Sequence, residues 1–292
     1  MFRKNFSFPF MKYRRQAILL SLGLVVVSLV LLFTKGLNLG IDFTGGNLIQ
    51  VEFASQVPVG DVRDPLAEIG QKQAVIQGYS DKGVIIRVNV DSEESRKEVI
   101  QTLKDKYPGM EVLRFEKVGP VVGEKLRREA FLAVSLALLG ILAYITVRFK
   151  FRFAVVSVVA LMHDTIITLG IFSLLGREIS LPFIAAILTI VGYSLNDTIV
   201  VFDRVRENWK YLRQEGLLKV LDMSINQTLS RTINTSLTTF FPVLALFIWG
   251  GAVIANFSFA LLLGILVGTY SSICIASSLL AEWYLRYPDN KK

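Results

Sequence analysis

The chain has 292 residues, of which 52% are hydrophobic, and its 32 lysines and arginines outnumber 24 acidic residues to give a formal net charge of +8. Its mean hydropathy of +0.51 is higher than a soluble protein of this length normally shows. The single cysteine, Cys274, excludes an intramolecular disulfide. The lysines and arginines lie beside the apolar segments, and this placement explains the excess of positive charge without a nucleic-acid partner.

Six apolar stretches are each long enough to cross a hydrocarbon core of about 30 Å as a helix. They cover residues 17–33, 130–147, 153–175, 181–202, 232–249 and 254–280. Basic residues precede the first stretch, but no small-x-small cleavage site follows it, which indicates an uncleaved anchor rather than a signal peptide. The sequence therefore predicts a polytopic α-helical protein in contact with membrane lipids.

The cations of the short loops predict the topology. Basic residues precede the first stretch, occupy the turn at 148–152 and recur between 204 and 219, whereas the loops at 176–178 and 250–252 contain one cation and none. We therefore expect both termini in the cytoplasm and the long insertion after the first helix on the opposite side.

The insertion between the first two membrane stretches has the pattern of a small α+β domain. Its periodicity predicts, in order, strand 48–53, helix 59–72, strands 74–79 and 84–90, helix 92–107 capped by Ser92, and strand 110–118. This order is the split βαβ arrangement of a ferredoxin-like domain. The predicted organisation is an N-terminal segment with the first helix (1–35), the ferredoxin-like domain (36–128), a five-helix region (129–284) with an amphipathic segment lying along the membrane surface (204–230), and a cytoplasmic tail (285–292).

Asp197 is the most unusual residue of the apolar stretches. It lies next to Asn196 and three residues after Ser194, and a carboxylate within a bilayer costs at least about 2.5 kcal/mol. Burial favours its protonated form and a nearby cation favours its ionised form, so such a group can carry a proton. The alternative is a carboxylate near the interface that only caps or pairs. We expect Asn196 and Ser194 to donate hydrogen bonds to it.

Arg231 opens the fifth stretch on the same side of the membrane as Asp197, and a run of polar residues including Thr235 and Ser236 follows it. Protonation of Asp197 would release Arg231, which makes the pair a charge switch coupled to helix movement. The polar run suits helix contact or a line of water. The alternative is a basic residue that only marks the cytoplasmic boundary.

His163 and Asp164 lie near the middle of the third stretch, where they either extend a proton relay or form a satisfied contact between helices. With one histidine in the chain, no metal site is expected. Gly264 and Gly268 form a GxxxG pattern that predicts close packing within the bundle.

The glycine-rich run after the first helix contains Gly40, Asp42, Gly45 and Gly46. We interpret it as a structural hinge into the insertion rather than as a catalytic site. No phosphate loop, nucleophile elbow or cofactor fingerprint is present, so neither an enzyme nor a cofactor is expected.

Five segments of the sequence together resemble the SecF family of bacterial protein-export membrane subunits. They are residues 40–46, 118–123, 163–164, 191–204 and 231–236. The resemblance covers essentially the whole chain. SecF proteins belong with the resistance-nodulation-division transporters, so the resemblance implies a SecD partner, the SecYEG channel and a translocating preprotein as further partners, and the bacterial inner membrane as location. It also implies that Asp197 and Arg231 couple proton passage, driven by the proton motive force, to movement of the periplasmic domain.

Two other functions are compatible with parts of the sequence. A small-molecule or lipid exporter of the same superfamily would have the same helices, but it would need a larger outer domain. An intramembrane aspartyl protease would need two membrane aspartates, which Asp164 and Asp197 supply, but neither lies in a Gly-x-Gly-Asp pattern.

Overall fold

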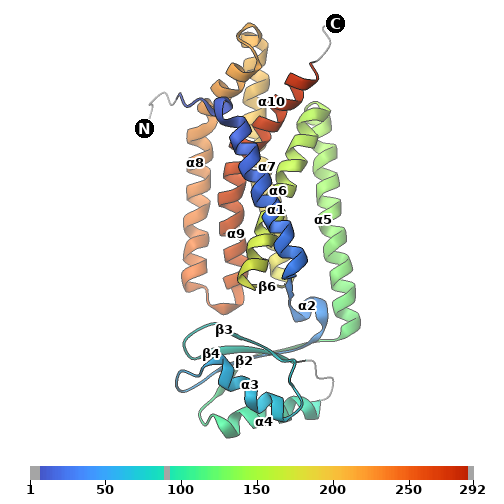
Figure 1. The fold of residues 1–292 in the computed structure, drawn as a ribbon, viewed down its shortest axis with the longest axis vertical. Helices are drawn as coiled ribbons and strands as arrows, with labels where there is room; N and C mark the ends of the chain where they lie inside the picture. The colour runs from blue at the N-terminus through green and yellow to red at the C-terminus, as the bar shows by residue number, and fades with distance from the viewer. Residues whose placement is uncertain (1–6, 89–92, 289–292) are drawn as a thin grey trace. The chain divides into compact units, whose positions relative to one another are not determined.

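The computed structural model describes residues 7–88 and 93–288, which fold into two compact units. One unit contains the chain up to Asn38 and from Leu132 onward and is almost entirely helical, and the other spans Leu39–Phe131 and mixes helices with strands (Figure 1). The short strand β1 (Asn38–Leu39) lies at the first junction, and helix α5 (Pro120–Arg148) runs through the second.

The helical unit is built from long apolar helices in antiparallel succession. Its elements are a 3₁₀ turn (Phe10–Tyr13), α1 (Arg14–Thr34), α5, α6 (Phe151–Leu175), strand β6 (Glu178–Ile179), α7 (Leu181–Leu212), α8 (Leu217–Trp249), α9 (Ala252–Tyr270), a π-helical segment (Ser271–Ala276) and α10 (Ser277–Arg286). In the described part of the chain, six helices are long and apolar enough to cross a membrane, which confirms the predicted number.

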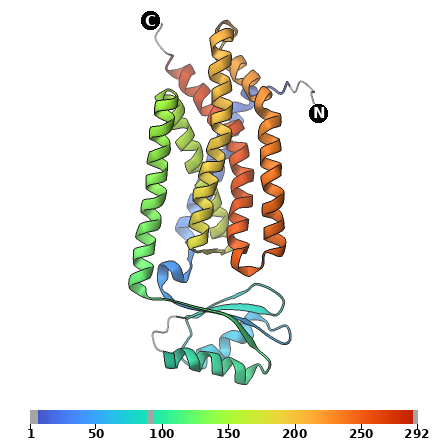
Figure 2. The same ribbon diagram turned by 180° about the vertical axis from the view of Figure 1, so that it is seen from behind.

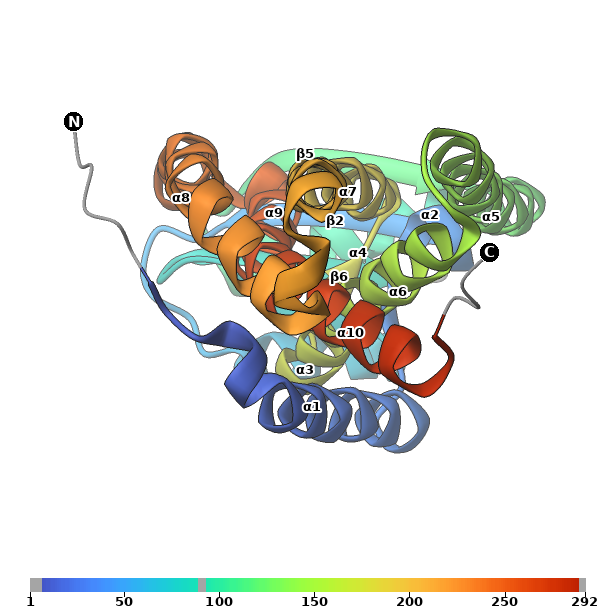
Figure 3. The ribbon, with the colours of Figure 1, turned by 90° about the horizontal axis from the view of Figure 1, so that it is seen from above.

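Helices α6, α7 and α9 form the centre of this unit. Helix α9 packs against α7 on one side and α8 on the other, and α1 packs against α6 (Figures 2 and 3). A side chain at position 170 would collide with Ser28, so the glycine there allows α1 and α6 to approach each other closely. Helices α1, α5 and α8 keep most of their apolar surface exposed, as expected of helices that face lipid or another chain.

The segment 204–230 is continuous with the helices on either side of it except for a short turn, and its predicted position along the membrane surface stays a prediction. Helix α7 continues to Leu212, a short 3₁₀ turn (Arg213–Glu215) follows, and α8 begins at Leu217. At 32 and 33 residues, α7 and α8 are each about 48 Å long and therefore extend beyond a 30 Å core. The apolar side chains of the segment are buried or half-buried. They pack against the N-terminal 3₁₀ turn (Phe10–Tyr13), α7 and α10, with Leu221 and Ile225 at the centre of this cluster.

The second unit has a four-stranded antiparallel sheet, two longer helices and one short helix. Its elements are a one-turn helix α2 (Ile41–Thr44), β2 (Gly46–Glu52), α3 (Val59–Glu68), β3 (Val75–Gly78), β4 (Gly83–Val88), α4 (Glu93–Lys106) and β5 (Glu111–Val118). The strand order is β3-β4-β2-β5, and every neighbouring pair is antiparallel, as in the predicted split βαβ arrangement. Side chains of α3 and α4 cover one face of the sheet, where Ile49, Val51 and Ile86 form the core.

One helix in this unit ends earlier than predicted, and two other predicted features cannot be compared because they fall on residues 89–92. Helix α3 ends at Glu68 rather than at residue 72, because Gly70 adopts a positive φ of +80° and Gln71 N donates to Leu66 O, which closes the helix. The predicted cap at Ser92 and the end of the strand at residues 89 and 90 lie outside the described residues.

Candidate functional site

Asp197 lies on the buried face of α7 and is 2% exposed. Thr235 on α8 donates a side-chain hydrogen bond to its carboxylate, and Arg231, one turn earlier on α8, interacts with it electrostatically. No direct ion pair joins Asp197 and Arg231 in the part of the chain that the structure describes, and the buried Oδ2 of Asp197 has no hydrogen-bond partner there. Three of the predicted site residues are thus brought together between α7 and α8, with one carboxylate oxygen unsatisfied.

The two neighbours expected to support Asp197 point elsewhere. Ser194 is buried, but its Oγ donates to Asp164 on α6 at 2.7 Å rather than to Asp197. Asn196 lies on the exposed face of α7, because successive helical residues are rotated by about 100°. The prediction that these two residues donate to Asp197 is therefore wrong.

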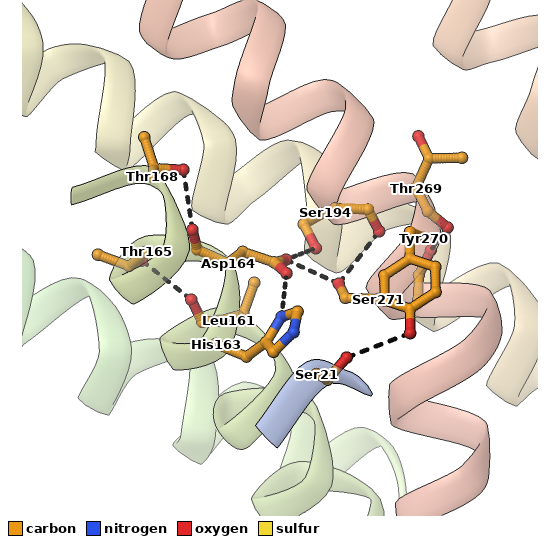
Figure 4. A network of polar contacts seen from close by, with 12 residues as sticks. Ser21, Leu161, His163, Asp164, Thr165, Thr168, Ser194, Thr269, Tyr270 and Ser271 are labelled. Atoms are coloured by element: carbon orange, nitrogen blue, oxygen red, sulfur yellow. Dashed lines mark hydrogen bonds and ion pairs between the residues drawn. The ribbon is translucent and has the colours of Figure 1, made fainter. Parts of the chain in front are cut away.

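Asp164 is the centre of a second polar cluster, shown in Figure 4. Its side chain is fully buried, and Oδ2 accepts hydrogen bonds from Ser194 Oγ at 2.7 Å and from Ser271 Oγ at 2.8 Å. Its Oδ1 lies 2.9 Å from Nδ1 of His163. A buried carboxylate needs such partners because an unpaired charge in the interior is costly. Asp164 thereby ties α6, α7 and the π-helical segment together at one point.

His163 lies at the edge of the Asp164 cluster and is 6% exposed. Its Nε2 is buried without a hydrogen-bond partner among the described residues, and its ring centroid lies 6.5 Å from that of Tyr270. Tyr270 is linked to α1, because its hydroxyl and Ser21 Oγ are 3.2 Å apart (Figure 4). Polar groups therefore extend from Asp164 toward α1 as well as toward α7.

Ser271, which donates to Asp164, is the first residue of a π-helical segment. The sequence predicts one uninterrupted helix over 254–280, but the backbone widens between Ser271 and Ala276 before α10 begins. Such segments are rare, occur mostly as single turns within α-helices, and are frequent at functional sites. Four fully or almost fully buried serines lie in or beside it: Ser271, Ser272, Ser277 and Ser278. Sequence reasoning missed Ser271, although the pair Ser271–Ser272 in an apolar stretch was a signal for a polar contact.

The polar run of α8 makes a further link between helices. Ser236 and Thr269 on α9 are hydrogen-bonded through their hydroxyls at 2.7 Å, and Thr235 also bonds to the backbone of its own helix. Thr232 is almost fully buried, and its hydroxyl has no partner among the described groups. The run thus contributes helix contacts as well as the hydrogen bond to Asp197.

The GxxxG pattern packs within the bundle, as predicted. A Cβ on Gly264 would lie 2.2 Å from Cγ1 of Ile190, and one on Gly268 would lie 3.0 Å from Cβ of Ser194. Helices α9 and α7 therefore approach closely along this face, which also brings Ser194 and Ser271 to Asp164.

The glycine-rich run belongs to the second unit. Gly40 precedes the one-turn helix α2, which includes Asp42, and Gly45 and Gly46 have positive φ values of +72° and +115°, which side-chain-bearing residues rarely adopt. A Cβ on Gly45 would lie 3.0 Å from Cα of Pro120, at the start of α5. The sharp turn and the close approach expected of these glycines are both present, and their role as a hinge stays a prediction.

Neither a metal centre nor an aspartyl dyad is formed by the described residues. No group of three His, Cys, Asp or Glu side chains gathers there. Asp164 and Asp197 have separate partners and are not hydrogen-bonded to each other in this part of the chain, whereas an aspartyl protease needs two carboxyl groups that share a proton. The protease alternative therefore has no geometric support.

Comparison with known proteins gives consistent matches over the whole chain. Residues 98–286 match the family model described as protein export membrane protein SecD/SecF, C-terminal, and residues 30–57 match the SecD/SecF GG motif. A protein translocase subunit SecF from Desulfurispirillum indicum is 48% identical over 96% of this chain and 92% of its own length. One from Pseudomonas aeruginosa is 43% identical over 93% of this chain and 90% of its own length.

A solved structure shows the same fold. The crystal structure of SecDF, a translocon-associated membrane protein from Thermus thermophilus, matches 98% of this chain with a TM-score of 0.93 and 44% identity. A SecDF structure in the super-membrane-facing form matches with a TM-score of 0.75 and 43% identity. The chain spans 40% of the length of each SecDF chain.

Proposed function

The chain belongs to the SecF family of protein translocase subunits, and from that premise we propose that it works in a complex, driven by the proton motive force, that assists preprotein translocation and release at the SecYEG channel. In this proposal it is not an enzyme, needs no cofactor, and uses protons as the coupling ion. It lies in the bacterial inner membrane with both termini in the cytoplasm.

A SecD-type subunit is the proposed partner within the membrane. The SecDF chains of known structure are much longer than this one, which leaves room in them for a second set of helices. The exposed apolar faces of α1, α5 and α8 provide surface for such a neighbour and for lipid. The ferredoxin-like unit would lie in the periplasm, as the distribution of loop cations favours.

The observation that carries the mechanism is the buried Asp197 with an unsatisfied Oδ2, facing Arg231 and Thr235 of α8. Protonation would remove the negative charge that holds Arg231 and would free α8 to shift relative to α7. One charge crossing the membrane supplies about 2.3 kcal/mol per 100 mV, which is enough to bias a two-state helix arrangement. Movement of α8 would pass to the periplasmic domain, with the glycines 40, 45 and 46 as its hinge.

The Asp164 cluster has a complementary role in this proposal. Ser194 of α7 and Ser271 of the π-helical segment bind Oδ2, and His163 of α6 itself contacts Oδ1, so the cluster holds a rigid frame against which α8 moves. His163, with its unpartnered Nε2, would extend the path of the proton toward α1.

The test is preprotein translocation in vesicles that contain this chain, its SecD-type partner and the SecYEG channel, with and without a proton gradient. We expect Asp197→Asn to assemble normally and to abolish the stimulation by the gradient. Asp203→Asn is the matched control, since Asp203 lies on the same helix but is half-exposed and paired with Arg148 and Arg206; it should keep the stimulation. Full stimulation with Asp197→Asn would remove Asp197 from the mechanism.

A further inference from the structure

The chain enters the helical unit through a short segment that folds onto α8. Residues 8–13 lie directly before α1, and Phe10–Tyr13 form the 3₁₀ turn that packs against α8. We call residues 8–13 the N-terminal strap. The strap belongs neither to the Asp197 site nor to the Asp164 cluster, so its contacts with α8 need a separate explanation.

Two side chains of α8, one helical turn apart, hold the backbone of the strap. Asn226 Oδ1 accepts a hydrogen bond from Phe8 N at 2.9 Å, and Asn226 Nδ2 donates to Phe8 O at 2.9 Å. Asp222 Oδ1 accepts from Met11 N at 2.8 Å, and Phe10 N also donates to this carboxylate. The amide of Asn226 is oriented by its own helix, because Nδ2 also donates to Asp222 O at 2.7 Å. Four hydrogen bonds thus satisfy backbone groups of the strap through α8.

Apolar packing adds to these hydrogen bonds. Met11 is almost fully buried and lies in the same cluster as Leu221 and Ile225 of α8, with Phe10 packed at its edge. The strap is also ordered by its own aromatic rings, since the ring centroid of Phe8 lies 4.7 Å from that of Phe10 and 5.8 Å from that of Tyr13. The strap is therefore a packed element rather than a loose tail.

The other end of the strap is fixed to α1 and α10. Arg14, the first residue of α1, donates through Nη1 to Met11 O at 3.0 Å and through Nε to Glu282 Oε1 on α10 at 2.8 Å. A segment that is held at both ends transmits the position of its support. The strap thereby ties the first turns of α8 to α1 and α10, two helices outside the Asp197 site.

The strap holds the half of α8 that faces Asp197. Arg231 is five residues after Asn226, which is about 7.5 Å along the helix axis. Seven of the eight buried residues of α8 lie within 220–236, and Val243 is the other. The strap and the buried contacts of α8 therefore act on the same half of the helix, which also carries Thr235.

We propose that Asp222 and Asn226 are positioning residues for the Asp197 site. By holding the strap they fix the rotation of α8 about its own axis, and this rotation decides whether Arg231 faces Asp197. The required precision is high, because adjacent residues of a helix are rotated by about 100° and separated by about 1.5 Å. The inference rests on the proposed function, in which Arg231 responds to the charge of Asp197.

Release of the strap can be measured directly in the full chain with its SecD-type partner in nanodiscs. Cys274→Ala removes the single cysteine, and Ser7→Cys, at an exposed position beside the strap, carries a nitroxide label. Its continuous-wave spectrum separates an immobile, bound strap from a mobile, released one. Asn226→Leu removes two hydrogen bonds to the strap, and each contributes a factor of at least about two. The ratio of immobile to mobile label should therefore fall at least about fivefold, and an unchanged ratio would overturn the proposal.

The position of α8 needs a second pair of labels. Val147→Cys on α5 and Ser230→Cys on α8 are exposed positions on helices at opposite sides of the bundle (Figure 3). Pulsed electron resonance between them gives the distance distribution. Asn226→Leu should shift and broaden this distribution. Lys219→Gln is the matched control, since Lys219 lies on the same end of α8 but pairs with Glu215, and it should leave the distribution unchanged.

The functional readout is the ratio of preprotein translocation with and without the proton gradient. Asp222→Leu should lower this stimulation, whereas the nearly isosteric Asp222→Asn keeps an acceptor oxygen for the strap and should retain most of it. Circular dichroism should be the same for both variants. A released strap with an unchanged α8 distance and full stimulation would overturn the inference and leave Asp197 in the mechanism. Full stimulation with Asp197→Asn would instead refute the proposed function, while the label measurements would still test whether the strap holds α8.

Discussion

Gly264 makes the tightest contact between α7 and α9, and its replacement by alanine tests whether that contact supports the bundle. An added Cβ would lie 2.2, 2.4 and 2.7 Å from three side-chain carbons of Ile190. Ordinary carbon contacts are about 3.5–4.0 Å, so the methyl group needs more than 1 Å of additional space. Ile190 is almost fully buried and is branched at Cβ, which leaves it few alternative rotamers.

The expected loss follows from two opposing terms. Overpacking of a well-packed interior costs typically about 1–3 kcal/mol. Alanine is a better helix former than glycine by about 1 kcal/mol, which offsets part of this cost. Gly140→Ala is the matched control, because a Cβ at Gly140 on α5 would contact nothing within 4 Å. The control should therefore gain up to about 1 kcal/mol, and because this gain is common to both variants they should differ by the overpacking cost of roughly 1–3 kcal/mol.

The assay is thermal unfolding of the purified full chain in one detergent, followed by circular dichroism at a single scan rate. The expected difference corresponds to roughly 2–10 °C between the melting temperatures of Gly264→Ala and Gly140→Ala. In a double-mutant cycle, Gly264→Ala should cost less in an Ile190→Ala background than in the parent chain, because the atoms that collide with the new methyl group are then absent. Equal melting temperatures for Gly264→Ala and Gly140→Ala would show that the close approach of α7 and α9 does not support the bundle.

Two further predictions concern residues outside the membrane-spanning helices. The guanidinium of Arg177 lies 4.2 Å over the ring of Phe259 and donates to Asn256 Oδ1 at 3.0 Å. Arg177→Met should therefore lower the free energy of unfolding by roughly 1–2 kcal/mol, measured by thermal unfolding. An unchanged melting temperature would contradict this. Burial, with smaller contributions from Asp61 and Asp64, raises the pKa of Tyr107 above its usual value of about 10. The folded chain thus keeps this proton where the unfolded chain loses it, so the stability that Tyr107 contributes is present below pH about 10 and falls as the pH rises further. Tyr107→Phe should make the alkaline loss of stability shallower, and an unchanged pH profile between about pH 9 and pH 12 would exclude the effect.

The sequence predicts the elements of this fold better than the contacts between them. Six apolar stretches and the order of strands and helices follow from periodicity, because both patterns are properties of consecutive residues. The early end of α3 also has a local cause at Gly70. The π-helical segment has no such local signal, since Ser271–Ala276 reads as ordinary apolar helix, and the segment packs against α6, α7 and α1.

The assignment of Ser194 shows why the polar contacts were only partly predictable. Ser194 and Asp197 are three residues apart, so their side chains leave α7 only about 60° from each other, and either could be assigned to the same neighbour. Two different helices pack there: α6 brings Asp164 to Ser194, and α8 brings Thr235 to Asp197. The rotation of α7 about its own axis depends on its close approach to α9 at Gly264 and Gly268. The sequence of one helix alone does not determine that approach.

The two buried carboxylates of the bundle differ in what surrounds them, and this difference separates their roles. Both oxygens of Asp164 have partners, and these include Ser194 and Ser271 from two other segments, so any movement of α6 against them breaks several bonds at once. Asp197 keeps one oxygen unsatisfied, which costs about 1–3 kcal/mol in the interior, and its partners Arg231 and Thr235 both come from α8, a helix with most of its surface exposed. A change of charge at Asp197 would therefore act on one helix, whereas the same change at Asp164 would disturb three segments, and this difference supports the proposal that Asp197 is the reversible switch.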